Sequence, residues 1–120
     1  MNTKEKMALQ PTNEKIAQLL KERNKGTADC MMVSEIARQI GMTGVELNRF
    51  LIDKEILKRN RREKKLELSL KYQNRGLTKS RSRFGYDSQG QLFEEVYQVW
   101  TEKGVEFLRR EFGLKIEYNI

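Results

Sequence analysis

The 120-residue sequence contains no histidine, one cysteine and one proline. Without histidine it lacks the commonest general base and the commonest metal ligand at neutral pH. A single cysteine excludes an internal disulfide bond and any zinc site built from several cysteines. No glycine-rich phosphate loop and no spacing that would activate a nucleophile is present. We therefore expect a protein that is not an enzyme and that uses no cofactor, metal ion or small-molecule substrate.

Long apolar runs are also missing. No run approaches the eighteen or so apolar residues that cross a bilayer, and the first ten residues lack the apolar centre of a signal peptide. The sequence therefore predicts a cytoplasmic protein without a membrane partner. The length predicts one domain over residues 13–120, and the polar, unpatterned start predicts a disordered arm over residues 1–12.

Positive charge is abundant, but it is unevenly distributed. Residues 58–83 contain eleven of the twenty-four basic side chains and only two acids, Glu63 and Glu67. This segment has a net charge of +9, so the other residues sum to −2 in a chain of net charge +7. Clustered positive charge attracts polyanions. A charge run alone is more often a solvated surface. The neighbouring residues therefore determine whether this run is interpreted as a binding site.

Residues 33–52, immediately before the basic segment, carry the spacing of a helix-turn-helix. Ala37 would let two helices approach closely, and Gly41, four positions later, would permit the tight turn. The apolar Leu47 and Phe50 follow at the positions that fix how the second helix packs on the first. Two amphipathic helices joined by glycine also occur in proteins that never bind DNA, so the match is moderately specific.

Capping signals mark both helices of this segment. Ser34 can cap a helix over residues 35–40. Thr43 can cap the second helix, and Glu46, three positions later, would complete a capping box. In a helix-turn-helix the outward face of the second helix enters the major groove. The candidate groove-reading residues are Thr43, Gly44, Glu46, Asn48 and Arg49.

Particular roles follow from the chemistry of these side chains. Arg49 could bond guanine, and Asn48 could bond adenine or a phosphate. Gly44 would let the backbone approach a phosphate at the start of the helix. The alternative for Arg49 is an ion pair with Asp53, four positions later.

The rest of the chain predicts a mixed fold. Asn13 can cap a helix over residues 14–24, whose buried stripe would be Ile16, Leu19 and Leu20. Alternating leucines predict a short strand within residues 66–70. The remaining expected elements are a hairpin from residue 77 to residue 100 with its turn at 87–90, a helix over 102–112 and a terminal strand over 114–120.

Two groups of basic residues are candidates for phosphate contacts. One lies in the charged loop after the second helix, and the other alternates along the first arm of the hairpin. Together they comprise Arg59, Arg61, Arg62, Lys64, Lys65, Lys79, Arg81 and Arg83. The alternatives are a solvated connector for the first group and an ordinary surface hairpin for the second.

Three stretches in order, VSEIARQIGM with ELNRFL, KYQNRGLTKS and VWTEKGVEFLRREF, resemble the phage antirepressor C-terminal domain of the KilA-C type. The resemblance covers about residues 28–113. It implies a DNA-binding domain of phage or mobile-element regulators, often the C-terminal half of a two-domain antirepressor. Residues 33–52 match its helix-turn-helix, and the hairpin over 79–100 matches the region that would serve as a wing.

The sequence thus predicts an α+β fold, a winged-helix-like helix-turn-helix with a β-hairpin wing and a C-terminal helix. The predicted function is sequence-specific or semi-specific binding of double-stranded DNA in transcriptional regulation. The alternative is an antirepressor-type module that binds and inactivates a repressor protein. A homodimer is also left open, through Ile16, Leu19 and Leu20 or through the terminal strand.

Overall fold

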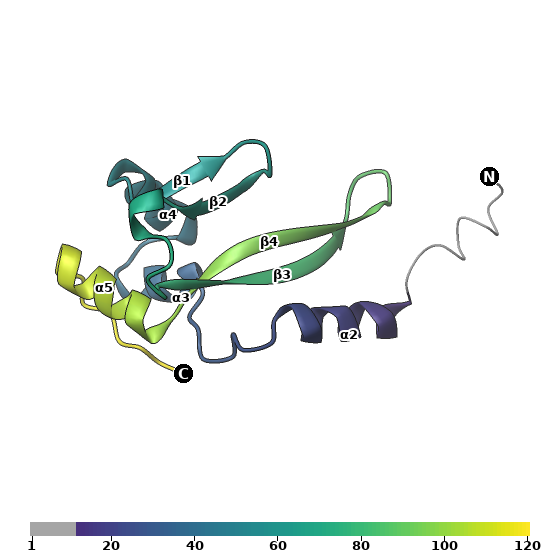
Figure 1. Ribbon diagram of the computed structural model, residues 1–120, viewed down its shortest axis with the longest axis horizontal. Coiled ribbons are helices and arrows are strands. Elements are labelled where there is room, and N and C mark those ends of the chain that lie inside the picture. The colour runs from purple at the N-terminus through teal and green to yellow at the C-terminus, as the bar shows by residue number, and fades with distance from the viewer. Residues whose placement is uncertain (1–11) are drawn as a thin grey trace.

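The fold is described from a computed structural model, which describes residues 12–120. It has four α-helices, a short 3-10 helix and two antiparallel hairpins in that range, which confirms the α+β class (Figure 1). The disordered arm predicted over residues 1–12 lies outside the described residues except for Thr12. The elements are α2 (Asn13–Arg23), α3 (Val33–Gln39), α4 (Gly44–Asp53), β1 (Leu57–Asn60), β2 (Lys65–Leu68), η1 (Leu70–Tyr72), β3 (Thr78–Tyr86), β4 (Leu92–Trp100) and α5 (Glu102–Phe112).

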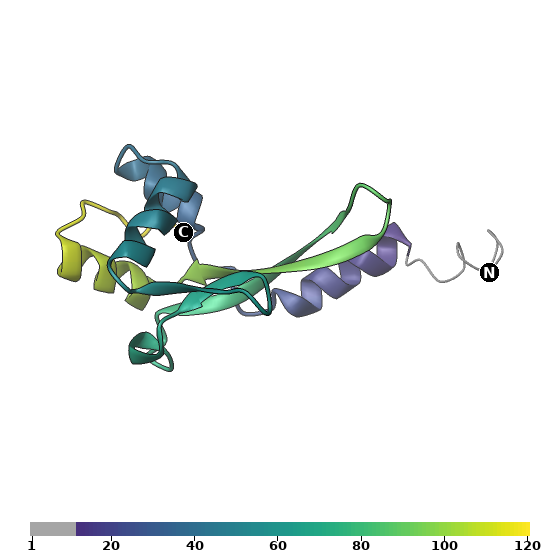
Figure 2. The same cartoon turned by 90° about the horizontal axis from the view of Figure 1, so that it is seen from above.

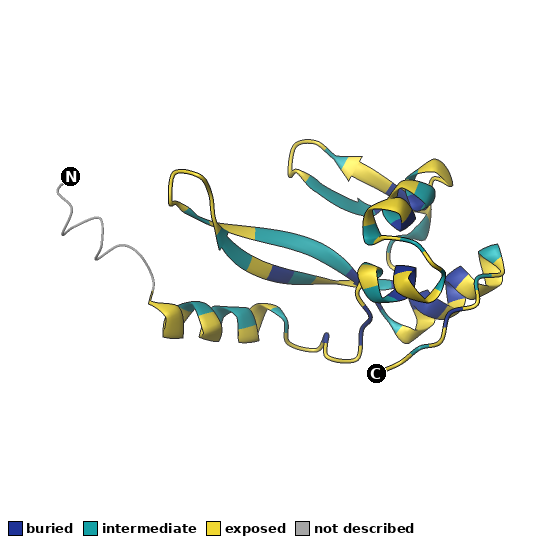
Figure 3. Cartoon of the chain, turned by 180° about the vertical axis from the view of Figure 1, so that it is seen from behind, coloured by how far each residue is buried: buried dark blue, intermediate teal, exposed yellow. Residues whose placement is uncertain are grey.

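The hydrophobic core lies where α3, α4, α5 and the bases of the two hairpins meet. Trp100, at the end of β4, is only 1% exposed and is the largest fully buried side chain. The inward residues of α3, α4 and α5 pack in the same cluster. In Figure 3 the buried residues gather at this end of the molecule, away from α2 and the hairpin tips.

Both hairpins are antiparallel, but they differ in length and position. The β1–β2 hairpin (residues 57–68) pairs Leu57 with Leu68 and Asn60 with Lys65. The β3–β4 hairpin (residues 78–100) pairs Thr78 with Trp100 and Tyr86 with Leu92, and it projects far beyond the core (Figures 1 and 2). β2 lies beside β4, so the shorter hairpin sits over the base of the longer one.

A tight joint fixes β4 to α5. Thr101 caps α5, because its hydroxyl oxygen accepts a hydrogen bond from the Gly104 N–H at 3.0 Å. Its own N–H donates to the Leu77 carbonyl oxygen at 3.1 Å. A Cβ at Gly104 would overlap that same carbonyl and touch the Trp100 ring. Only glycine therefore allows α5 to start so close to the beginning of β3.

Helix α2 runs along the β3–β4 hairpin, outside the core (Figure 1). Its predicted stripe, Ile16, Leu19 and Leu20, is only half-buried, and no residue of α2 is fully buried. The cap is Thr12 rather than the predicted Asn13. Just after the helix, the Asn24 side-chain amide donates to the Ser82 carbonyl at 3.1 Å and accepts from the Ser82 N–H at 2.7 Å. Both backbone groups of Ser82 on the outer edge of β3 are thus hydrogen-bonded.

The long hairpin and the last helix are confirmed close to their predicted bounds. At the predicted turn, the Asp87 carboxylate accepts hydrogen bonds from the backbone N–H groups of Gln89 and Gln91. Helix α5 buries Val105 and Leu108 fully, and it ends at Gly113 in the left-handed conformation (φ 64°).

Two expectations for strands were wrong. Residues 58–65 were expected to form a charged loop, yet Lys58, Arg59 and Asn60 belong to β1, because each finds a cross-strand partner on β2. The terminal strand over 114–120 is absent, since these residues have no neighbouring strand. Instead Ile116 is buried, and Gln39 bridges the Glu117 backbone by donating to its carbonyl at 2.9 Å and accepting from its N–H at 2.6 Å.

Candidate nucleic-acid interface

Helices α3 and α4 form the helix–turn–helix unit predicted from the spacing. Ala37 and Leu47 are completely buried where the helices meet, and Phe50 is half-buried against Phe112 of α5. Gly41 adopts a left-handed conformation (φ 71°), and the Met42 N–H donates to the Ala37 carbonyl at 2.9 Å to close the turn. The first helix starts earlier than predicted, at Val33, because the Glu35 carboxylate accepts a hydrogen bond from the Met32 N–H at 3.2 Å.

Two of the predicted groove-reading residues form the cap of α4. The Thr43 hydroxyl oxygen accepts from the Glu46 N–H at 3.1 Å, and the Glu46 carboxylate accepts from the Thr43 N–H at 3.0 Å. This confirms the predicted capping box. A glutamate is ionised at neutral pH, and the hydrogen bonds from Thr43, backbone first, lower the pKa of the Glu46 carboxyl further. The negative charge of Glu46 at this point disfavours the approach of other negatively charged groups to the start of α4.

The structure places Gly44 on the side of α4 that faces α3. A Cβ there would lie 3.5 Å from Val33 Cγ1 and 3.6 Å from the Ser34 Cα, which is ordinary van der Waals contact. The expectation that Gly44 admits a phosphate stays a prediction.

Asn48 and Arg49 do lie on the outward side of α4, where they meet the β1–β2 hairpin. A shallow hollow between the two elements, which we call the α4–hairpin hollow, is lined by Val45, Asn48, Arg49, Ile52, Arg59 and Leu66. Arg59 reaches it because it lies two positions after Leu57, and side chains two positions apart share a face of a strand. The ion pair between Arg49 and Asp53 is not formed in the described part of the chain.

Sequence reasoning missed Val45 and Ile52 as members of this face. The sequence could have indicated their position, because neither residue belongs to the inward stripe of Leu47, Phe50 and Leu51. Helical spacing places Val45 with Asn48, Arg49 and Ile52, at positions i, i+3, i+4 and i+7.

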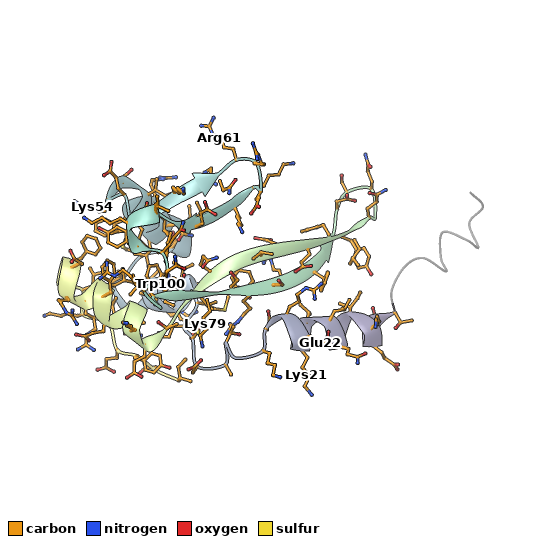
Figure 4. All side chains as sticks on the ribbon, in the orientation of Figure 1. Lys21, Glu22, Lys54, Arg61, Lys79 and Trp100 are labelled. Atoms are coloured by element: carbon orange, nitrogen blue, oxygen red, sulfur yellow. The ribbon has the colours of Figure 1, made fainter. Side chains whose placement is uncertain are left out.

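The β1–β2 hairpin exposes most of its positive charge. Lys65 pairs with Glu63 at 2.9 Å, and Lys58 approaches Glu67 at 3.7 Å. Within residues 12–120 the other four cations have no hydrogen-bond, ion-pair or aromatic partner for their side chains. These are Arg59, Arg61, Arg62 and Lys64. Figure 4 shows Arg61 at the turn of this hairpin, pointing away from the rest of the molecule.

The three β3 cations that are predicted to contact phosphates form bonds to groups of the protein itself. Lys79 donates to the Gly26 carbonyl at 2.8 Å, and Figure 4 shows it directed toward the segment that follows α2. Arg81 donates to the Thr27 hydroxyl at 3.1 Å and to the Thr27 carbonyl at 2.5 Å. Arg83 pairs with Glu95 across the hairpin at 2.6 Å. These cations tie β3 to the segment that follows α2 and to β4.

The two hairpins also differ in net charge. The β1–β2 hairpin has six basic and two acidic side chains in twelve residues, whereas the β3–β4 hairpin has three of each in twenty-three. The positive surface is therefore local, and it adjoins the outward face of α4.

Among the described residues, no helix is both long and apolar enough to span a bilayer.

Comparisons with known proteins place the chain in one family. Searches of curated proteins and of solved structures found no match. The family model described as "Phage antirepressor protein KilAC domain" matches residues 12–114, so the match includes α2, which lay outside the range expected from the sequence. With most of its length matched, the chain belongs to the phage antirepressor KilAC domain family.

Proposed function

We propose that this domain binds double-stranded DNA, with α4 in the major groove and the β1–β2 hairpin on the adjacent phosphates. The observation that carries the proposal is a group of four cations beside the outward face of α4 that have no partner within residues 12–120: Arg59, Arg61, Arg62 and Lys64. When surface cations neutralise phosphates, they release the counterions condensed on the DNA, which supplies essentially all of non-specific DNA affinity. Family membership supports a phage regulatory role.

The proposal assigns the wing to a different hairpin from the one expected from the sequence. The β1–β2 hairpin follows α4 after only three residues, and it contacts α4 through β1. A hairpin in this position can track the DNA backbone while the helix beside it reads base edges. The β3–β4 hairpin lacks unengaged cations, so we give it a supporting role.

A titration of fluorescently labelled random duplex across a salt series tests the proposal. The logarithm of the association constant should fall linearly with the logarithm of salt concentration, with a slope of about −0.9 per phosphate contacted. Arg49→Ala should lower the affinity for a preferred site by about 1–3 kcal/mol, the value of a base contact. A complex whose affinity does not change between 50 and 200 mM salt would contradict the proposal.

A specific observation favours a second function, the binding of a protein. Tyr86 and Phe93, near the tip of the β3–β4 hairpin, are 53% and 44% exposed. Exposed aromatic side chains are enriched at protein interfaces. A repressor or a second copy of the chain could attach there, and such a complex would survive nuclease treatment. Molecular mass in solution, measured for the wild type and for Tyr86→Ser, separates a homodimer from binding to another protein.

A further inference from the structure

We propose that Val45 recognises the 5-methyl group of thymine, so that the preferred DNA site has a thymine opposite the first turn of α4. The inference rests on the proposed DNA-binding function and specifies what that surface selects. It assigns a sequence-reading role to a side chain that the sequence pattern did not single out.

Val45 is exposed at the start of α4, on the side that faces the α4–hairpin hollow. Its side chain is 68% exposed, which among the large apolar residues described is exceeded only by Leu70 at 78%. It is the second residue of α4 and takes no part in the core cluster. A β-branched residue also lowers helix stability slightly relative to alanine. Neither packing nor helix propensity therefore accounts for valine at this position.

The surroundings of Val45 match the edge of a base pair in the major groove. The α4–hairpin hollow combines apolar side chains with the hydrogen-bond donors of Asn48, Arg49 and Arg59. In the major groove, bases present acceptors and amino donors, and the thymine methyl is the apolar group among them. Residues in the first turn of a groove-reading helix are those that contact base edges. An exposed apolar side chain beside amide and guanidinium donors is therefore complementary to thymine next to a purine.

Charge favours DNA over a protein as the occupant of this surface. Arg49 and Arg59 line the hollow, and neither has an ion-pair partner among residues 12–120. An apolar protein surface placed there would bury two unpaired guanidinium groups, which is costly. Phosphates on either side of the groove would neutralise them.

The experiment compares thymine with uracil, which keeps the hydrogen-bonding edge of thymine and lacks only the methyl group. The preferred duplex is first selected from a random pool with the wild-type chain. Each thymine of the selected site is then replaced singly by uracil, and binding is measured by anisotropy. We expect one position to lose about fourfold in affinity, the value of burying one methyl group. Val45→Ala should bind thymine and uracil equally at that position.

Leu70→Ala is the matched control, because Leu70 is more exposed than Val45 and lies outside the hollow. This variant should keep the full preference for thymine. Val45→Ala is expected to fold, since alanine is the better helix former and the side chain is exposed. Circular dichroism of both variants checks this.

The outcomes separate the inference from the proposed function. Salt-dependent binding with no loss at any uracil position would overturn the inference and leave the proposed function intact. An unchanged thymine preference in Val45→Ala would also overturn it, because the methyl group would then be read by another residue. Absence of any duplex binding would overturn both.

Discussion

The two hairpins have similar chemistry in sequence and different roles in the structure. Each carries a run of basic residues, and both runs fall within the +9 segment. In the β1–β2 hairpin four of six cations remain unpartnered within the described residues, whereas all three cations of β3 bond to groups of the protein itself. The difference teaches that charge density locates a positive segment, but internal acceptors decide which of its cations can bind an external anion.

The largest effect is expected at the base of the β3–β4 hairpin. If this hairpin is a structural support, its joint to α5 should tolerate no added atom. Gly104→Ala should lower the free energy of unfolding by about 3 kcal/mol, because the new methyl group overlaps the Leu77 carbonyl. Urea unfolding, followed by the fluorescence of the buried Trp100, measures the loss.

Gly44→Ala is the control for this substitution. It also adds a methyl group in the first turn of a helix, but at ordinary contact distance from Val33. Its stability should remain within about 0.5 kcal/mol of wild type. Reduced DNA affinity at unchanged stability would support the predicted approach of a phosphate to Gly44. A stable Gly104→Ala protein would contradict the account of the joint.

A smaller effect, on binding, tests the contrast between the hairpins directly. Arg61→Gln with Arg62→Gln removes two unpartnered cations and should reduce the salt slope by about 1.8, or about 2 kcal/mol of binding near 0.1 M salt. Lys79→Gln with Arg83→Gln removes the same charge from β3 and should leave the slope unchanged. Anisotropy titrations at four salt concentrations measure both. Equal reductions in the two double variants would show that the hairpins do not differ in function.

The smallest effect concerns the acids of the β1–β2 hairpin. Glu63 accepts a hydrogen bond from Lys65, which with the charge of Lys65 lowers the pKa of its carboxyl below the usual 4.5. Because the pKa is lowered on folding, the stabilisation is complete above pH 4.5 and is lost as the pH falls below it. With no histidine in the chain, DNA affinity should be flat from pH 6 to pH 8.

Glu63→Gln isolates this carboxyl. The variant should bind DNA slightly more tightly than wild type at pH 7, since one negative charge is removed beside the unpartnered cations. It should also lose less stability than wild type on acidification from pH 6 to pH 3, as thermal melts across that range would report. If the wild type and Glu63→Gln lose the same stability between pH 6 and pH 3, the Glu63 carboxyl does not contribute to the pH dependence of stability.

Local signals made the helix–turn–helix unit predictable. Gly41, Thr43 and Glu46 act through neighbours at most five residues away, so their roles could be inferred from spacing. The start of α5 was predictable for the same reason, because Thr101 caps it locally. The closeness of Gly104 to Leu77 was not, since the two residues are far apart in the chain.

Partners distant in sequence explain what could not be predicted. Lys79 and Arg81 find their acceptors 53 and 54 residues away, and nothing in their own segment indicates it. Strand β1 was hidden because its only buried residue is Leu57, and its pairing depends on β2 beyond the turn. The terminal segment alternates like a strand, but it has no sheet edge to join and is bonded by Gln39 instead.

The contact between Asn24 and Ser82 has a consequence for the solution behaviour of the domain. The outer edge of a two-stranded ribbon presents unpaired peptide groups, which can template pairing with another chain. The amide of Asn24 occupies both backbone groups of Ser82, in the middle of that edge, and α2 runs beside it. The β3 edge of the projecting hairpin is therefore less available for pairing with a strand of another chain.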